Sequence, residues 1–309
     1  MKTVLTCDMK LLVYIFLCLG VSWTVAGLMH LNDVPYNSIA GKVIIALGYM
    51  PGPAIAAVLT HIFLYKGGWS RFGFNFKHIN YWGLALVPAF YLGYCLLTLT
   101  IVFSFGNLLG IVDFGIVSFN NDLILSNIEE LSGFQFDRQS VNMPPPVVLL
   151  LICLGAGVLA GATVNTAIAL GEEIGWRGFM FNELRQYGFL RSSTIIGFCW
   201  GLWHVPVILM GHNFPHHPIT GSIVMIVFCI ALSMLHSIVR RASNTVLAPA
   251  ALHGMINAGA PGILLFISNE NELFGSIVGV AGILSALLVT GAYLLIRNIL
   301  SRKGRLVTA

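Results

Sequence analysis

The sequence predicts an all-α fold, a bundle of about eight membrane-spanning helices. Composition, apolar segment length and the placement of basic residues predict it. Hydrophobic residues make up 57% of the 309 residues and charged residues only 9%, whereas a soluble domain carries about 25% charged residues. The mean hydropathy is +0.86. We therefore expect residues 1–309 to form a single integral membrane domain.

Apolar segments of the required length recur along the chain. A spanning helix needs about 20 mostly apolar residues. Eight segments meet this requirement, near residues 11–30, 43–65, 82–105, 147–171, 192–210, 221–239, 246–267 and 274–296. We expect the second to be kinked or broken at Pro51-Gly52-Pro53 and the fourth to continue past Glu172 towards Arg185.

The basic residues predict the orientation of these helices, because cytoplasmic loops are rich in Lys and Arg. With both termini in the cytoplasm, all but Lys42 and Arg138 of the 16 basic residues lie in inner segments. These are Lys2, Lys10, Lys66, Arg71, Lys77, Arg177, Arg185, Arg191, Arg240, Arg241, Arg297, Arg302, Lys303 and Arg305. An even number of spanning helices satisfies this alternation.

The remaining features point to no additional domain or partner class. The hydrophilic stretch 113–146 is expected to be an external loop, and the apolar run 11–29 an uncleaved first helix, because it exceeds a typical signal-peptide core. The six cysteines are expected to be core-filling thiols. With a net charge of only +4 and no basic run, we expect no nucleic-acid partner. The cysteines are Cys7, Cys18, Cys95, Cys153, Cys199 and Cys229.

Three helices of the second half carry polar residues inside apolar segments. Charged groups in a bilayer are costly and are retained for pairing or function. The first helix has Glu172-Glu173 followed by Arg177, and Glu173 and Arg177 are spaced to pair on one face. A solvated salt bridge at a cytoplasmic helix end is the alternative reading of this pattern.

The second and third helices repeat the four-residue spacing. Trp200 precedes His204, and His253 precedes Asn257. A single buried histidine is often a structural hydrogen-bonding residue, and bundles use such pairs for helix–helix bonds. The similar depth of the three motifs in the membrane favours a shared site over three separate structural contacts. Glu172, His204 and His253 each lie 12 or 13 residues from a cytoplasmic arginine, about 18–20 Å along a helix. Residues 150–260 therefore contain one candidate site. On this reading Arg177 belongs to the site.

The residue types indicate the chemistry of that site. A glutamate and a histidine that share a water can remove its proton. A second histidine with an amide on one helix face can stabilise an oxyanion. Together they are suited to amide hydrolysis without a covalent intermediate. The alternative is a zinc site with Glu172, His204 and His253 as ligands. We favour a site without a metal or other cofactor.

The three motifs together resemble the CPBP intramembrane protease family, which includes CAAX prenyl endopeptidases and bacteriocin-processing or self-immunity proteins. The family pattern is EExxxR, an aromatic residue four before a histidine, and HxxxN. This sequence has Glu172-Glu173 with Arg177, Trp200 with His204, and His253 with Asn257, in that order. The family often has Phe where this chain has Trp200.

The resemblance implies a role for each of these residues. Glu172 would be the general base, assisted by His204, and His253 with Asn257 would bind the oxyanion. Glu173 and Arg177 would maintain the geometry. The substrate would be a peptide or protein that is membrane-bound or lipidated, with membrane lipids as the other partners. We accordingly expect a multi-pass protease of a bacterial cell membrane, with a cavity open to the cytoplasm.

Two further functions stay open at this point. One is a non-catalytic self-immunity or scaffold protein that keeps the motifs for structure. The other is a proton-coupled transporter, since buried Glu and His also form proton relays. Transporters often have matching broken helices in two halves, whereas the polar residues of this chain lie in the second half only.

Overall fold

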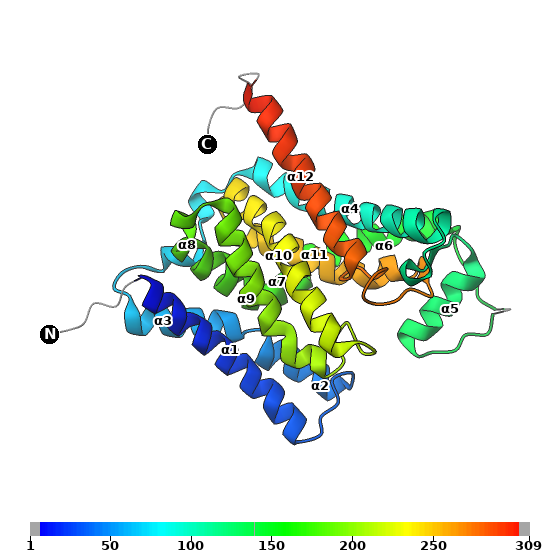
Figure 1. Cartoon of the computed structure of the whole chain (residues 1–309), viewed down its shortest axis with the longest axis horizontal. Helices are drawn as coiled ribbons and strands as arrows, with labels where there is room; N and C mark the ends of the chain where they lie inside the picture. Colours follow the sequence, from blue (N-terminus) through cyan, green and yellow to red (C-terminus); the bar gives the residue numbers. More distant parts are fainter. Residues whose placement is uncertain (1–6, 139, 303–309) are drawn as a thin grey trace.

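A bundle of helices makes up most of the described structure (Figure 1). The computed structural model describes residues 7–138 and 140–302, with side chains from Met9 onwards. Lys2, Lys303 and Arg305, which entered the orientation argument, and the side chain of Cys7 lie outside the described part. Within that part, seven helical segments are long and apolar enough to span a membrane. They cover residues 9–31, 39–64, 81–108, 146–183, 189–209, 218–243 and 280–302.

The first half forms three of these segments. Helix α1 covers Cys7–Leu31 and packs against α3 and α9. The next segment is broken as Pro51-Gly52-Pro53 predicts: α2 (Ile39–Ile44) and a π-helical turn (Ile45–Tyr49) end before Pro51, and α3 (Gly52–Leu64) begins after it. Helix α4 covers Tyr81–Val102 and ends in a π-helical turn, Phe103–Leu108.

One helical segment of 38 residues carries the first motif. It runs from Pro146 to Glu183, so the expected continuation past Glu172 is confirmed. Three α-helices make it up, α6 (Pro146–Ala160), α7 (Thr166–Glu173) and α8 (Phe181–Glu183). π-helical turns join them at Gly161–Asn165 and Ile174–Met180. Such turns are rare and are frequent at functional sites. The EExxxR motif lies across the second turn.

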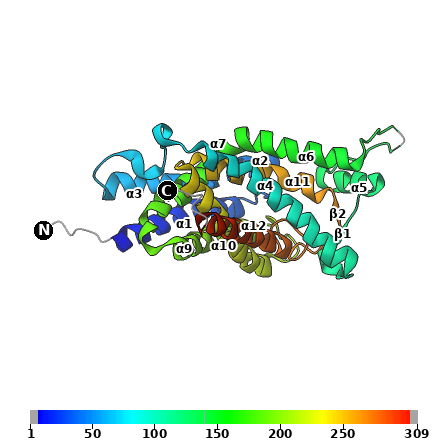
Figure 2. The ribbon, with the colours of Figure 1, turned by 90° about the horizontal axis from the view of Figure 1, so that it is seen from above.

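The other two motifs lie on α9 and α11. Helix α9 covers Phe189–Leu209, α10 covers Pro218–Ser243, α11 covers Leu247–Leu264 and α12 covers Val280–Arg302. The expected seventh segment, 246–267, thus forms α11, but this 18-residue helix is not among the seven segments that are long and apolar enough to span a membrane. His253 and Asn257 lower its hydropathy. It packs against α4, α6, α7 and α10 instead of forming an apolar outer helix; α6 and α11 lie side by side in Figure 2.

Close helix approaches hold the motif helices together. Gly197 and Gly201 place α9 directly on α10, since a Cβ on either would lie 2.4 Å from an α10 Cα atom. A Cβ on Gly161 would lie 2.3 Å from the Cα of Met255 on α11. Small residues that let backbones approach are typical of membrane helix interfaces. These contacts place α10 against α9 and α11 against the segment 146–183.

The external stretch 113–146 is more ordered than a simple loop. It contains α5 (Asn121–Ser132) and strand β1 (Ile116–Val117), which pairs antiparallel with β2 (Ile267–Ser268). These elements lie together at one end of the molecule (Figure 2). Short 3₁₀ turns occupy Trp69–Phe72, Phe76–His78, Val112–Phe114 and Arg185–Tyr187.

The described cysteines are free thiols, as expected for core-filling residues. They are Cys18, Cys95, Cys153, Cys199 and Cys229.

An ion pair closes the segment after α5. Glu129 accepts hydrogen bonds from the backbone N–H of Phe136 (3.1 Å) and from the guanidinium of Arg138. These donors lower the pKa of Glu129. A lowered pKa means that the bonds stabilise the folded segment above the unfolded pKa, and that this contribution is lost as the pH falls through the folded pKa.

We expect Glu129→Gln to speed tryptic cleavage after Arg138 at pH 7.5, because the amide is a weaker acceptor and the ion pair is lost. Cleavage rates from gel densitometry check this expectation. Glu130→Gln, which changes the neighbouring exposed carboxylate, is the matched control and should leave the rate within about twofold, as an exposed charge contributes little. Equal rates in the two variants would contradict the assignment.

Candidate active site

The three motif helices meet around the indole of Trp200 on α9. Its Nε1–H donates to Glu172 Oε2 at 2.9 Å. Its ring centroid lies 5.3 Å from that of His253 and 5.9 Å from that of His204. The guanidinium carbon of Arg177 lies 4.5 Å from the same ring centroid. The expected convergence of the motifs is therefore confirmed, and Trp200 is its centre.

The second glutamate anchors a buried ion pair. Glu173 Oε1 accepts from Arg177 Nη1 at 2.8 Å and lies 3.1 Å from His253 Nδ1. Both members of the pair are fully buried. Because a carboxylate only accepts, Nδ1 of His253 carries the hydrogen. Removing one partner of such a pair leaves an uncompensated buried charge and costs about 3–5 kcal/mol. Arg177 therefore lies inside the cluster of polar residues, at the depth that the sequence predicted.

Arg240 of α10 supports the π-helical turn that contains Arg177. The backbone carbonyl of Arg177 accepts a hydrogen bond from Arg240 Nε at 3.0 Å. A π-helical turn perturbs the regular helical hydrogen-bond pattern, and a buried carbonyl needs a partner. Arg240, expected only as a cytoplasmic charge, thus supports the turn that carries the first motif.

His204 is oriented by the main chain of Trp200. Its Nδ1 lies 2.8 Å from the carbonyl oxygen of Trp200. Since a carbonyl only accepts, Nδ1 donates and Nε2 keeps a lone pair. His204 is half-buried. Trp200 consequently orients Glu172 with its side chain and His204 with its backbone.

Asn257 lies at the border of the cluster. It is one helical turn beyond His253 on α11 and its side chain is exposed, whereas His253 is buried. In the part of the chain that the structure describes, Asn257 has no hydrogen-bond partner. The structure thus brings six of the seven predicted site residues together and leaves the seventh at their edge.

His236 on α10 is a member of the cluster that sequence reasoning missed. Its side chain is fully buried, and its ring centroid lies 5.5 Å from Trp200 and 5.9 Å from His253. The predicted helix ended at residue 239, which made His236 a helix-end residue. Helix α10 continues to Ser243. The four-residue spacing of His236 and Arg240 was the available signal.

The residues that could hold a metal differ from the predicted set. Among the described residues, one group has ligand atoms within 4.8 Å of one another, and it consists of Glu173, His236 and His253. The predicted ligands Glu172 and His204 are absent from it. The guanidinium of Arg177 already binds Glu173 Oε1, so a divalent cation there would meet a positive charge a few ångström away. This donor set fits a metal poorly.

His212 differs from the other histidines of the α9–α10 connection. Its ring is stacked on His204, with centroids 6.2 Å apart and planes within 7°, and its Nδ1 is bonded to the hydroxyl of Tyr36. Burial lowers the pKa of His212 to about 4, so it is neutral at pH 7. His216 and His217 are exposed and contact Glu272, as is typical of a solvated loop.

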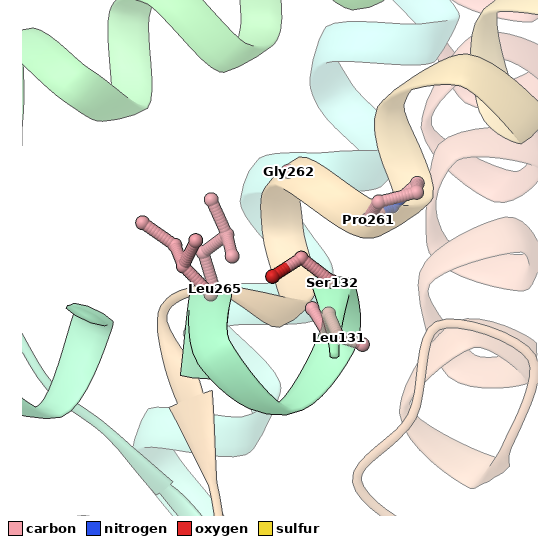
Figure 3. Close-up of a pocket in the computed structure, with 6 residues that line it drawn as sticks. Leu131, Ser132, Pro261, Gly262 and Leu265 are labelled. Atoms are coloured by element: carbon pink, nitrogen blue, oxygen red, sulfur yellow. The ribbon is translucent and has the colours of Figure 1, made fainter. Parts of the chain in front are cut away.

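A separate apolar pocket lies outside the polar cluster. It has a volume of about 370 Å³ and lies between α5 and the end of α11 (Figure 3). Pro261, one turn beyond Asn257, is part of its wall. The lining residues are Ile128, Leu131, Ser132, Pro261, Gly262 and Leu265.

Comparison with known proteins identifies the motif-bearing segment. Residues 143–259 match the family of type II CAAX prenyl endopeptidase Rce1-like proteins. A similar curated protein is CAAX prenyl protease 2 of Methanococcus maripaludis, 29% identical over 100 residues, which are 32% of this chain and 30% of that protein. The chain thus matches less than a third of that relative's length. The matched family segment contains every predicted site residue, and the resemblance drawn from the motifs is confirmed.

We expect Trp200→Phe to destabilise the protein more than Trp203→Phe, by about 1–3 kcal/mol, because it leaves the buried Glu172 carboxylate without a donor. Trp203 is the matched control, since its buried Nε1 has no hydrogen-bond partner among the described residues. Both substitutions remove the same volume. Denaturant unfolding in detergent measures the difference, and equal losses would disprove the role of the indole N–H.

Proposed function

We propose that this chain, a member of the CPBP intramembrane protease family through residues 143–259, is an intramembrane endopeptidase. In this proposal Glu172 and His204 activate a water molecule for peptide hydrolysis. The observation that carries the proposal is the double use of Trp200, whose indole binds Glu172 and whose carbonyl binds His204. A carboxylate and an imidazole with a free Nε2 are thereby oriented by one residue.

The proposed reaction follows from these groups. Glu172 accepts a proton from water, with His204 Nε2 as a second acceptor, and the hydroxide adds to the carbonyl carbon of the scissile bond. Asn257 donates to the resulting oxyanion, and so does His253 through Nε2–H in its imidazolium form, while its Nδ1–H stays on Glu173. When the C–N bond breaks, the proton passes from Glu172 to the leaving amine. Glu173 and Arg177 hold His253 in position through the buried ion pair.

The proposed substrate is a peptide segment presented at the membrane. The matched family and the curated relative are named for CAAX prenyl substrates, which favours a lipidated C-terminal segment as the finer assignment. We propose that the protein lies in a bacterial cell membrane, with the site open to the cytoplasm.

The decisive test is Glu172→Gln in lipid nanodiscs. Peptides released from a membrane fraction are identified by mass spectrometry, and the rate should fall about 10²–10⁴-fold because the general base is lost. Glu130→Gln serves as the control for loss of a carboxylate. A folded Glu172→Gln protein with full cleavage activity would disprove the proposed role of Glu172 and favour a non-catalytic scaffold function.

Metal removal tests the mechanism separately. Because the donor set fits a metal poorly, we expect cleavage to stay within about twofold after dialysis against EDTA or exposure to 1,10-phenanthroline. Loss of activity that zinc restores would instead assign the water activation to a metal.

A further inference from the structure

Two buried hydrogen-bond acceptors, one on Glu173 and one on His236, have no partner among the described residues. His236 Nδ1 lies 2.9 Å from the carbonyl oxygen of Leu232 and therefore carries the hydrogen. Its Nε2 keeps a lone pair, is buried and is unpartnered among the described residues. Oxygen Oε2 of Glu173 is in the same situation. An unsatisfied buried polar atom costs about 1–3 kcal/mol.

The side chains that carry these acceptors border one small space. One carboxylate oxygen of Glu173 and one ring nitrogen each of His236 and His253 lie within 4.8 Å of one another. Since Nδ1 of His236 is engaged by Leu232, Nε2 is the nitrogen that remains available to this space. Two acceptors cannot bond each other directly, so the space requires a donor.

A water molecule satisfies this requirement better than a cation. It can donate one hydrogen to Glu173 Oε2 and the other to His236 Nε2, and buried waters typically make about three hydrogen bonds. The third partner is available because Arg177 has buried Nε and Nη2 groups without a partner among the described residues. The same guanidinium repels a divalent cation.

We propose that His236 is a positioning residue that holds one buried water molecule together with Glu173. The bridging water fixes the carboxylate of Glu173. Because Glu173 Oε1 accepts from His253 Nδ1, the bridge also fixes the orientation of the His253 ring. His236 itself does not touch the reacting atoms. The effect on catalysis rests on the proposed function, whereas the water-bridged pair does not.

A double-variant cycle tests the bridge without any activity measurement. Melting temperatures are compared for wild type, Glu173→Gln, His236→Leu and the double variant in detergent. We expect the double variant to lose clearly less than the sum of the two single losses, because either substitution already removes the bridge. Additive losses would overturn the proposal.

A matched control uses the buried histidine His61 of α3, which is 4% exposed and packs against Trp69 and Phe72. Combining His61→Leu with Glu173→Gln should give additive losses, since sites without shared partners act independently. Non-additivity of the same size in this control would also overturn the proposal, because the coupling would then not be specific to His236.

Kinetics test the positioning role. We expect His236→Leu to lower kcat about 10²-fold, as small misplacements of reacting groups do, with KM within about twofold. His236→Gln, whose amide oxygen can accept from the water, should restore most of kcat. An unchanged kcat in His236→Leu, or no rescue by Gln, would contradict the role. If wild type cleaves nothing, the proposed function fails and the melting cycle still decides on the bridge.

A zinc titration distinguishes a water molecule from a cation as the occupant of the space between Glu173 and His236. We expect added zinc to leave the melting temperature of wild type and His236→Leu equally unaffected. A rise in wild type that His236→Leu abolishes would identify a cation site and overturn the water bridge.

Discussion

The buried ion pair of Glu173 and Arg177 is the interaction on which the rest of the site depends. Two opposite charges removed from water persist only when further hydrogen bonds compensate their desolvation. Here His253 contacts the carboxylate, Trp200 lies against the guanidinium, and Arg240 binds the backbone carbonyl of Arg177. Helices α9, α10 and α11 each contribute one of these partners. The pair therefore explains why the three helices converge at this level of the bundle.

The sequence was sufficient for much of this arrangement because polar residues stand out in apolar helices. The four-residue spacing of Glu173 and Arg177 predicted their pairing, and counting from the arginines predicted that Glu172, His204 and His253 meet. Both arguments need only the helical repeat. The break at Pro51 followed equally from the chemistry of proline.

What the sequence did not predict depends on tertiary contacts. The π-helical turns arise where close packing shifts the hydrogen-bond pattern, which no local pattern encodes. His236 was hidden because α10 extends beyond its apolar stretch to Ser243. Asn257 shares a face with His253 by spacing, yet His253 is buried and Asn257, one turn further along α11, is exposed. The hydropathy of α11 is low because it carries His253 and Asn257, and the helix packs against α4, α6, α7 and α10.

The length of the segment 146–183 ties the site to the membrane itself. Its 38 residues correspond to about 57 Å of straight helix, nearly twice the hydrocarbon thickness of about 30 Å. Such a segment must tilt steeply, protrude from the bilayer or thicken it locally. Glu172 and Glu173 lie in its last third, so a change in lipid chain length acts on the same element that carries the carboxylates. Bilayer thickness thereby becomes a physical variable of the site, alongside its polar contacts.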